Sequence, residues 1–87
     1  ASDIHFRPGD PPFYRVNGAL RPLKNVDPLV PAQTRAIVET LLGDSPHSLT
    51  IDRLQELAFS YSVPNVSRFR VNVYRQRGTL AAILRII

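Results

Sequence analysis

The last quarter of the chain constrains its fold most, because Ser67–Ile87 has the pattern of one long β-hairpin. Apolar residues alternate with polar ones in the first half of this segment, as in a strand with one buried face. A two-residue turn signal, Arg77-Gly78, comes next, and the apolar run that follows it has the length of a strand. The segment therefore predicts two antiparallel strands joined by a tight turn.

The length of this turn determines which residues face each other. A two-residue turn at Arg77-Gly78 would place Val71 opposite Leu84 on the buried face, and Arg70 opposite Arg85 on the other face. Like charges directly opposite each other are unfavourable, and a longer turn of the same parity would leave the two arginines diagonal. In either register, the outer face of the hairpin collects cations.

Arginine is concentrated in the same hairpin. Lys24 is the only lysine among eleven basic residues, and no acidic residue follows Glu56. Strand parity predicts two basic groups: Arg68, Arg70 and Arg85 on the face of the sheet, and Arg75 and Arg77 projecting from the hairpin tip. A guanidinium binds carboxylate or phosphate through a fixed fork of donors. Both groups are therefore candidate contacts for an anion or an acidic partner surface.

Two other interpretations of these arginines stay open. One is a solvated charged face without a partner. The other is a nucleic-acid interface, since arginines that neutralise phosphates supply affinity. Proteins that bind single strands stack several aromatic rings on the bases, whereas Tyr74 is the only ring on the outer face of the first hairpin strand. We therefore expect no nucleic-acid partner.

The rest of the chain predicts a strand, a hairpin, two helices and one further strand. Asn17-Gly18 is a strong hairpin signal because both turn positions need positive φ. Ser45 is a candidate N-cap, with Pro46 at the first helical position. The expected strands are Ser2–Arg7, Phe13–Val16, Ala19–Leu23 and Phe59–Val63, and the expected helices are Ala32–Leu42 and one from Pro46 to about Leu57. This order predicts one α+β domain over residues 1–87, with a mostly antiparallel sheet and two helices packed on one face.

Composition and motifs argue against several kinds of chemistry. The chain has no cysteine, so it has no disulfide or thiolate metal site, which favours the cytoplasm. Its only lysine lies outside any Walker A pattern, so the chain has no P-loop of its own. His5 and His47 lack the spacing of paired metal ligands, and no nucleophile motif is present, so we expect neither a metal site nor a catalytic residue. Asp3 and His5 share the polar face of the first strand, where a surface pair would orient the imidazole.

Three separated blocks of the chain resemble the secretion ATPases of type II and type IV systems, and most of all their pilus-retraction branch. The first block is ASDIHF at Ala1–Phe6, and the second is PPFYRVNG at Pro11–Gly18. The third consists of Val63-Pro64, RFRVN at Arg68–Asn72 and QRG at Gln76–Gly78. The order and spacing of the blocks extend the resemblance over almost the whole chain.

The resemblance implies a PAS-like domain that precedes a RecA-like ATPase domain, which these 87 residues do not include. In this family six subunits form a ring, and the N-terminal domain packs on the ATPase domain of a neighbouring subunit. The implied role is regulation and oligomerisation, with nucleotide-phosphate or inter-subunit contacts at Arg68, Arg70, Arg75, Arg77 and Arg85.

The resemblance also implies what surrounds the domain. The segment itself would have no cofactor and no catalytic activity, whereas the complete motor would use ATP and Mg. It would work in the cytoplasm at the inner-membrane base of the pilus machine, with the membrane platform as a further partner. The alternatives are a small basic nucleic-acid-binding module, the N-terminal domain of a related pilus-assembly or type II secretion ATPase, and a PAS-like sensor with a small ligand in its core.

Overall fold

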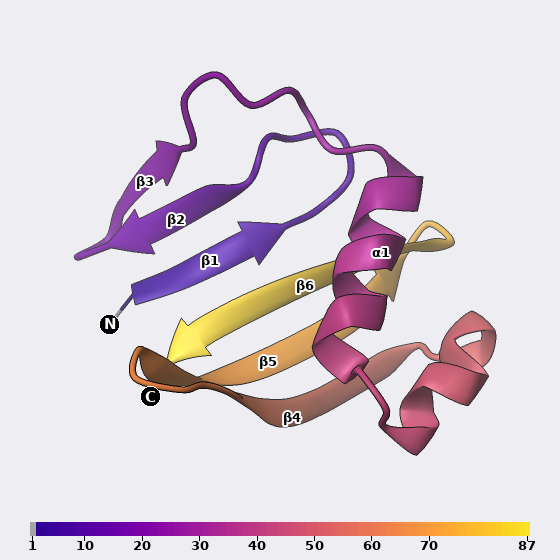
Figure 1. The fold of residues 1–87 in the computed structure, drawn as a ribbon. Coiled ribbons are helices and arrows are strands. Elements are labelled where there is room, and N and C mark those ends of the chain that lie inside the picture. The colour runs from indigo at the N-terminus through magenta and orange to yellow at the C-terminus, as the bar shows by residue number, and fades with distance from the viewer. Residues whose placement is uncertain (1) are drawn as a thin grey trace.

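The computed structural model describes residues 2–87, which form a six-stranded antiparallel sheet with one α-helix on one face (Figure 1). The strands are β1 (Ser2–Phe6), β2 (Phe13–Val16), β3 (Ala19–Pro22), β4 (Glu56–Val63), β5 (Ser67–Gln76) and β6 (Thr79–Ile86), and the helices are α1 (Pro31–Leu42) and the 3-10 helix η1 (Pro46–Arg53). The order across the sheet is β3-β2-β1-β6-β5-β4. The first and last strands therefore pair at the centre of the sheet, and the predicted α+β class is confirmed.

The long C-terminal hairpin has the register that a two-residue turn predicts. β5 and β6 pair Val71 with Leu84, and Arg70 with Arg85. The two residues of the Arg77-Gly78 turn have positive φ values of 53° and 80°, as a type I′ turn requires. The tight turn is confirmed, and the alternative with a longer turn is wrong.

A second hairpin of the same kind builds the other half of the sheet. The Asn17-Gly18 turn has φ values of 50° and 82° and joins β2 to β3. β1 pairs with β2 on one side and with β6 on the other. The strand ends differ slightly from the prediction: β1 and β3 each stop one residue early, and β4 begins at Glu56 instead of Phe59.

The predicted second α-helix is wrong. Pro46–Arg53 form a 3-10 helix that is interrupted at Thr50, and the helix does not reach Leu57. The predicted cap is present, since the Ser45 side chain accepts a hydrogen bond from the amide of His47 at 3.3 Å. The helix ends early because exposed and half-buried residues alternate along β4, which satisfies its backbone through pairing with β5.

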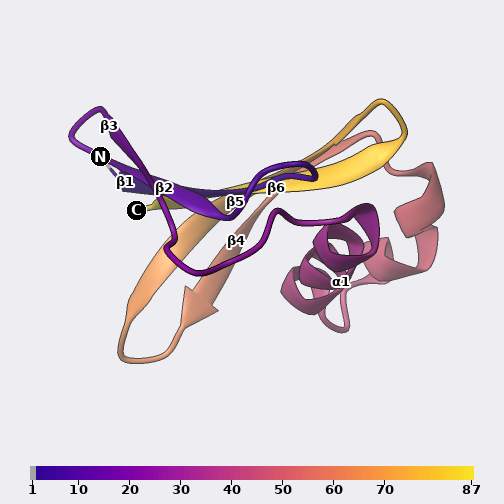
Figure 2. The same cartoon turned by 90° about the horizontal axis from the view of Figure 1, so that it is seen from above.

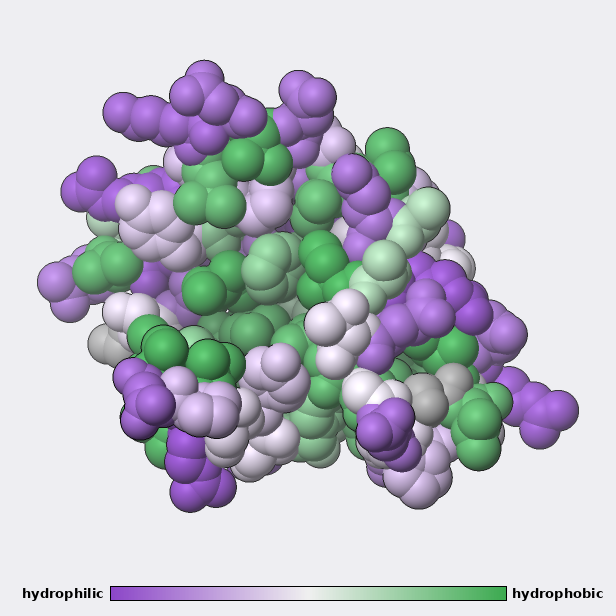
Figure 3. Space-filling view, in the orientation of Figure 1, coloured by the Kyte–Doolittle hydropathy of each residue, from purple (hydrophilic) through white to green (hydrophobic). Residues whose placement is uncertain are grey.

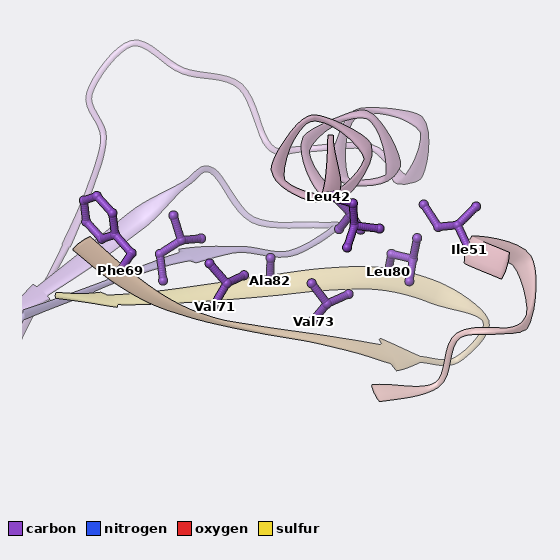
Figure 4. Close-up of a cluster of buried hydrophobic side chains, with 9 residues drawn as sticks. Leu42, Ile51, Phe69, Val71, Val73, Leu80 and Ala82 are labelled. Carbon is purple, nitrogen blue, oxygen red and sulfur yellow. The ribbon is translucent and has the colours of Figure 1, made fainter. Parts of the chain in front are cut away.

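The hydrophobic core lies between α1, η1 and the long hairpin. Figure 4 shows side chains from both helices pointing toward β5 and β6, and the buried cluster consists of Val38, Leu42, Ile51, Phe69, Val71, Val73, Leu80, Ala82 and Leu84. Both helices lie on the same side of the sheet, and Figure 2 shows none on the opposite side in residues 2–87. We call these two sides the helix face and the outer face.

The α-helix covers only part of the helix face. It packs mainly on β6 and leaves most of the β1–β3 half uncovered (Figure 1). Figure 3 shows apolar side chains in the hollow of the sheet beside α1. Neither helix of the described residues has the length and apolar composition of a membrane span.

An exposed ion pair connects α1 to η1. Arg35 donates a hydrogen bond through Nη1 to Asp52, and its Nε lies 3.6 Å from Oε1 of Glu39. This hydrogen bond, followed by the charge of Arg35, lowers the pKa of Asp52 below its usual value. A carboxyl with a lowered pKa in the folded state stabilises the fold above its unfolded pKa, and the contribution is lost as the pH falls through the folded pKa.

We therefore expect Asp52→Asn to be slightly less stable than the wild type at about pH 6, and equally stable well below about pH 3. The effect is small because both side chains are exposed to solvent. Urea unfolding midpoints of both proteins, measured across this pH range, would test the expectation. Midpoint curves that stay parallel down to the lowest pH would contradict it.

Candidate functional site

β5 and β6 place three arginines together on the outer face. Arg70 and Arg85 are direct cross-strand partners, and Arg68 lies two residues before Arg70, on the same side of β5. All three residues are exposed. We call them the arginine face, and their predicted placement on one side of the sheet is confirmed.

The arginine face has an excess of positive charge. Neither the guanidinium group of Arg68 nor that of Arg70 has a hydrogen bond or an ion pair with another residue in the range 2–87. The direct pairing of Arg70 with Arg85 is unfavourable by roughly a few tenths of a kcal/mol. An anion bound above these guanidinium groups would offset the repulsion and accept hydrogen bonds from their free N–H groups.

Arg15 extends this basic row on the neighbouring hairpin. The register places Asp3 of β1 between Arg15 of β2 and Arg85 of β6. Nη2 of Arg85 lies 3.9 Å from Oδ2 of Asp3. The sequence analysis did not select Arg15 as a site residue, although its position two residues before the Asn17-Gly18 turn determines its face.

The predicted contact between Asp3 and His5 is present. Nε2 of His5 lies 3.0 Å from Oδ1 of Asp3. The expectation of a surface pair is wrong, because the side chains are only 15% and 12% exposed. The His5 ring stacks on Phe13 with a centroid distance of 4.6 Å and an interplanar angle of 9°. Asp3 is thus a fixed carboxylate that offsets one of the positive charges in the row.

Arg75 does not project from the hairpin tip, which corrects the prediction. Its parity directs it to the helix face, where Nε donates to the carbonyl of Leu54 at 2.9 Å and Nη2 to that of Ile51 at 2.8 Å. Nη1 donates to the carbonyl of Gly78 at 2.8 Å. Carbonyls at a helix end are short of donors within the helix; the carbonyl of Ile51 also accepts from the amide of Leu54 at 3.3 Å, and Arg75 adds a charged donor to it and to the carbonyl of Leu54. This side chain connects η1 to the β5–β6 turn.

Arg77 lies in the β5–β6 turn, and its basic neighbour is Arg7 instead of the predicted Arg75. It is exposed and has no hydrogen bond or ion pair among the described residues. It lines a hollow of about 260 Å³ together with Arg7 and Thr79. The second basic group therefore consists of Arg7 and Arg77, and the predicted grouping of Arg75 with Arg77 is wrong.

The side chains of the outer face can bind anions. Guanidinium groups pair with phosphate or carboxylate in a forked geometry, and several of them lie free on this face. Residues 2–87 contain no group of three or more histidine, aspartate or glutamate side chains that could hold a metal ion.

The class of the protein follows from this fold together with comparisons to known proteins. No protein-family model matches the chain. Both its sequence and its fold match secretion ATPases over the full length of the chain. The chain is similar over its whole length to members of this family, in the region that forms their N-terminal domain.

The particular relatives include pilus ATPases. The chain is 37% identical over 87 residues to the type IV pilus retractation ATPase PilT of Pseudomonas aeruginosa, a match that covers 100% of the chain and 25% of PilT. It is 36% identical over 86 residues to the type IV pilus ATPase PilU of the same organism, covering 97% of the chain and 22% of PilU.

Solved structures agree with these sequence matches. The crystal structure of the pilus retraction motor PilT with bound ADP superposes with a TM-score of 0.82 at 36% identity. The X-ray structure of the Legionella pneumophila ATPase DotB gives 0.78 at 26% identity. Each match covers 100% of the chain and 25% of the solved chain, so this protein segment spans about a quarter of the length of its relatives.

Proposed function

We propose that this domain is the N-terminal regulatory and oligomerisation domain of a hexameric ATPase that retracts type IV pili. Its match to PilT over all 87 residues supports a motor of this kind as the parent. In this proposal the domain does not hydrolyse ATP, and a RecA-like domain elsewhere in the complete protein binds ATP and Mg. The parent acts in the cytoplasm at the inner-membrane base of the pilus machine, where the membrane platform is a further partner.

The observation that carries the proposal is the arginine face. The exposed guanidinium groups of Arg68 and Arg70 have no hydrogen bond or ion pair within residues 2–87. Arg85 has one carboxylate nearby, that of Asp3. In a ring of subunits, a neighbouring ATPase domain would supply the missing anion, either as nucleotide phosphate or as acidic side chains. We leave Arg75 out of this contact, because hydrogen bonds to three carbonyls of its own domain hold its side chain on the helix face.

Such a contact would couple the nucleotide state to the geometry of the ring. If the guanidinium groups reach the anion in one subunit arrangement and not in another, the free energy of their interaction favours the first arrangement. Binding and release of nucleotide would then move the N-terminal domain as a rigid body against its neighbour. The domain would regulate turnover in this way without taking part in the chemical step.

The proposal predicts that removing charge from the arginine face impairs the complete motor. In the full-length protein, Arg70→Gln combined with Arg85→Gln should lower ATPase turnover about tenfold, which corresponds to ~1.4 kcal/mol. Both side chains are exposed, so the variant should fold. Turnover measured with saturating ATP, and hexamer content measured by light scattering, would report the two proposed roles separately.

The matched control is Arg53→Gln, which removes an exposed cation from η1 that does not belong to the arginine face. It should leave both turnover and hexamer content unchanged. Wild-type turnover and assembly in the arginine-face variant would refute the proposed contact. Salt-sensitive oligonucleotide binding that this variant loses, with ATPase activity intact, would favour the nucleic-acid module instead.

A further inference from the structure

We propose that a groove on the outer face, at the turn end of the sheet, binds a short acidic segment of a partner protein. The groove consists of two hollows that share Arg7 and Asp10. One has a volume of about 260 Å³ and charged and polar walls, and the other has about 370 Å³ and mostly apolar walls. This surface is distinct from the arginine face.

The polar hollow has free donors for a carboxylate. Arg7 donates through Nε to Oδ2 of Asp10 at 2.7 Å, and its Nη1 and Nη2 have no hydrogen-bond partner within residues 2–87. Arg77 reaches the same hollow from the β5–β6 turn, beside Thr79. Two guanidinium groups thus face one carboxylate that is already paired. The charge of this hollow is complementary to an acidic side chain.

The apolar hollow is suited to a hydrophobic side chain. Its walls include Pro11, Phe13, Leu20 and Pro22. Phe13 is only 9% exposed, because it stacks on His5 and the Arg7 guanidinium lies 5.0 Å from its ring centroid. Leu20 is 55% exposed and has no cover on this side in the described residues. Burying it against a partner would be favourable, because apolar surface would be removed from water.

The segment between β1 and β2 holds the groove in shape. The amide of Gly9 donates to the carbonyl of Leu29 at 2.8 Å, and the amide of Leu29 donates to the carbonyl of Asp10 at 2.9 Å. The amide of Leu23 donates to the carbonyl of Pro12 at 2.9 Å. Leu29 is buried, so this segment is anchored to the body of the domain. A preformed surface loses little conformational entropy when it binds a peptide.

The two basic regions are too far apart to hold one small ligand. Arg70 and Arg77 are separated by seven residues, which is roughly 20 Å along an extended strand. A free phosphate would use only the polar hollow, and a nucleic acid would need an open aromatic ring, whereas Phe13 is covered. A peptide with an apolar residue followed by carboxylates uses both hollows, and it is the occupant that the groove favours.

The test uses the full-length protein and a fluorescent hexapeptide that contains leucine and phenylalanine followed by aspartate and glutamate. Fluorescence polarisation should show binding with a Kd below about 1 mM. Arg77→Gln and Leu20→Ser should each weaken binding about fivefold. Both residues are exposed, so neither change should affect folding. The Arg53→Gln control should bind the peptide as the wild type does.

Two altered peptides complete the test. Exchange of the acidic residues for asparagine and glutamine, or of the apolar residues for glycine, should each weaken binding. Equal binding of the glycine peptide, together with displacement by inorganic pyrophosphate, would overturn the proposal in favour of a simple anion site. No binding by the wild type, or full binding by both groove variants, would also overturn it. The Arg70→Gln/Arg85→Gln variant should keep the peptide, so this result is independent of the proposed motor function.

Discussion

Replacement of Arg75 by alanine is expected to lower the free energy of unfolding by about 2–4 kcal/mol. The change removes three hydrogen bonds that a charged group donates to the carbonyls of Ile51, Leu54 and Gly78, of which that of Ile51 keeps a bond from the amide of Leu54. It also releases η1 from the β5–β6 turn. Urea unfolding of the 87-residue chain, followed by circular dichroism, would measure the loss.

Arg77→Ala is the matched control, because it removes the same side chain two residues away. Arg77 is exposed and has no partner in the described part of the chain, so its loss should change stability by less than about 0.5 kcal/mol. Arg75→Lys should recover only part of the stability, since one ammonium cannot reproduce the planar fork of guanidinium donors. Equal unfolding midpoints for Arg75→Ala and Arg77→Ala would show that the three bonds are not stabilising.

Leu42→Ala is expected to cost about 3 kcal/mol of stability. Leu42 is 6% exposed and belongs to the cluster that joins α1 to the long hairpin (Figure 4). Truncation removes buried methyl groups and leaves a cavity beneath the helix. The same urea experiment would measure the change.

The control for this variant is Leu49→Ala, which has the same chemistry at a position that is 88% exposed. Its effect should stay within about 0.5 kcal/mol. A loss of similar size at both positions would mean that the change in helix propensity or in the unfolded chain dominates, and that α1 is not held by packing at Leu42.

The hairpins and their registers could be predicted because their determinants are local. Asn17-Gly18 and Arg77-Gly78 each supply the positive φ values of a tight turn, and alternation on either side decides which residues are buried. The arginine face follows from the same two facts. Parity alone places Arg70 and Arg85 side by side on the outer face.

The errors arose where distant parts of the chain meet. Parity directs Arg75 to the helix face, but its partners depend on where η1 ends, and that end depends on the pairing of β4 with β5. Arg7 could not be grouped with Arg77 from sequence, because their common hollow exists only when the segment after β1 is anchored through Leu29. Long-range contacts of this kind carry no local signature.

Two units of the domain, β1–β3 and the remainder, meet where β1 pairs with β6, and they differ in how easily they open. Four residue pairs, from Asp3–Arg85 to Phe6–Ala82, join the β1–β3 unit to the rest of the sheet. α1 packs mainly on the other unit, so the smaller one is held by this strand pairing, by the contacts of Ile4 and Phe6 with the core and by the anchor at Leu29, and it has the lower free energy of local opening. Arg15 and Arg85 lie on opposite sides of that boundary, with Asp3 between them. An anion bound to both arginines would therefore hold the two units together. Its release would lower the free energy needed to open the β1–β3 unit, while the core of the other unit stayed folded.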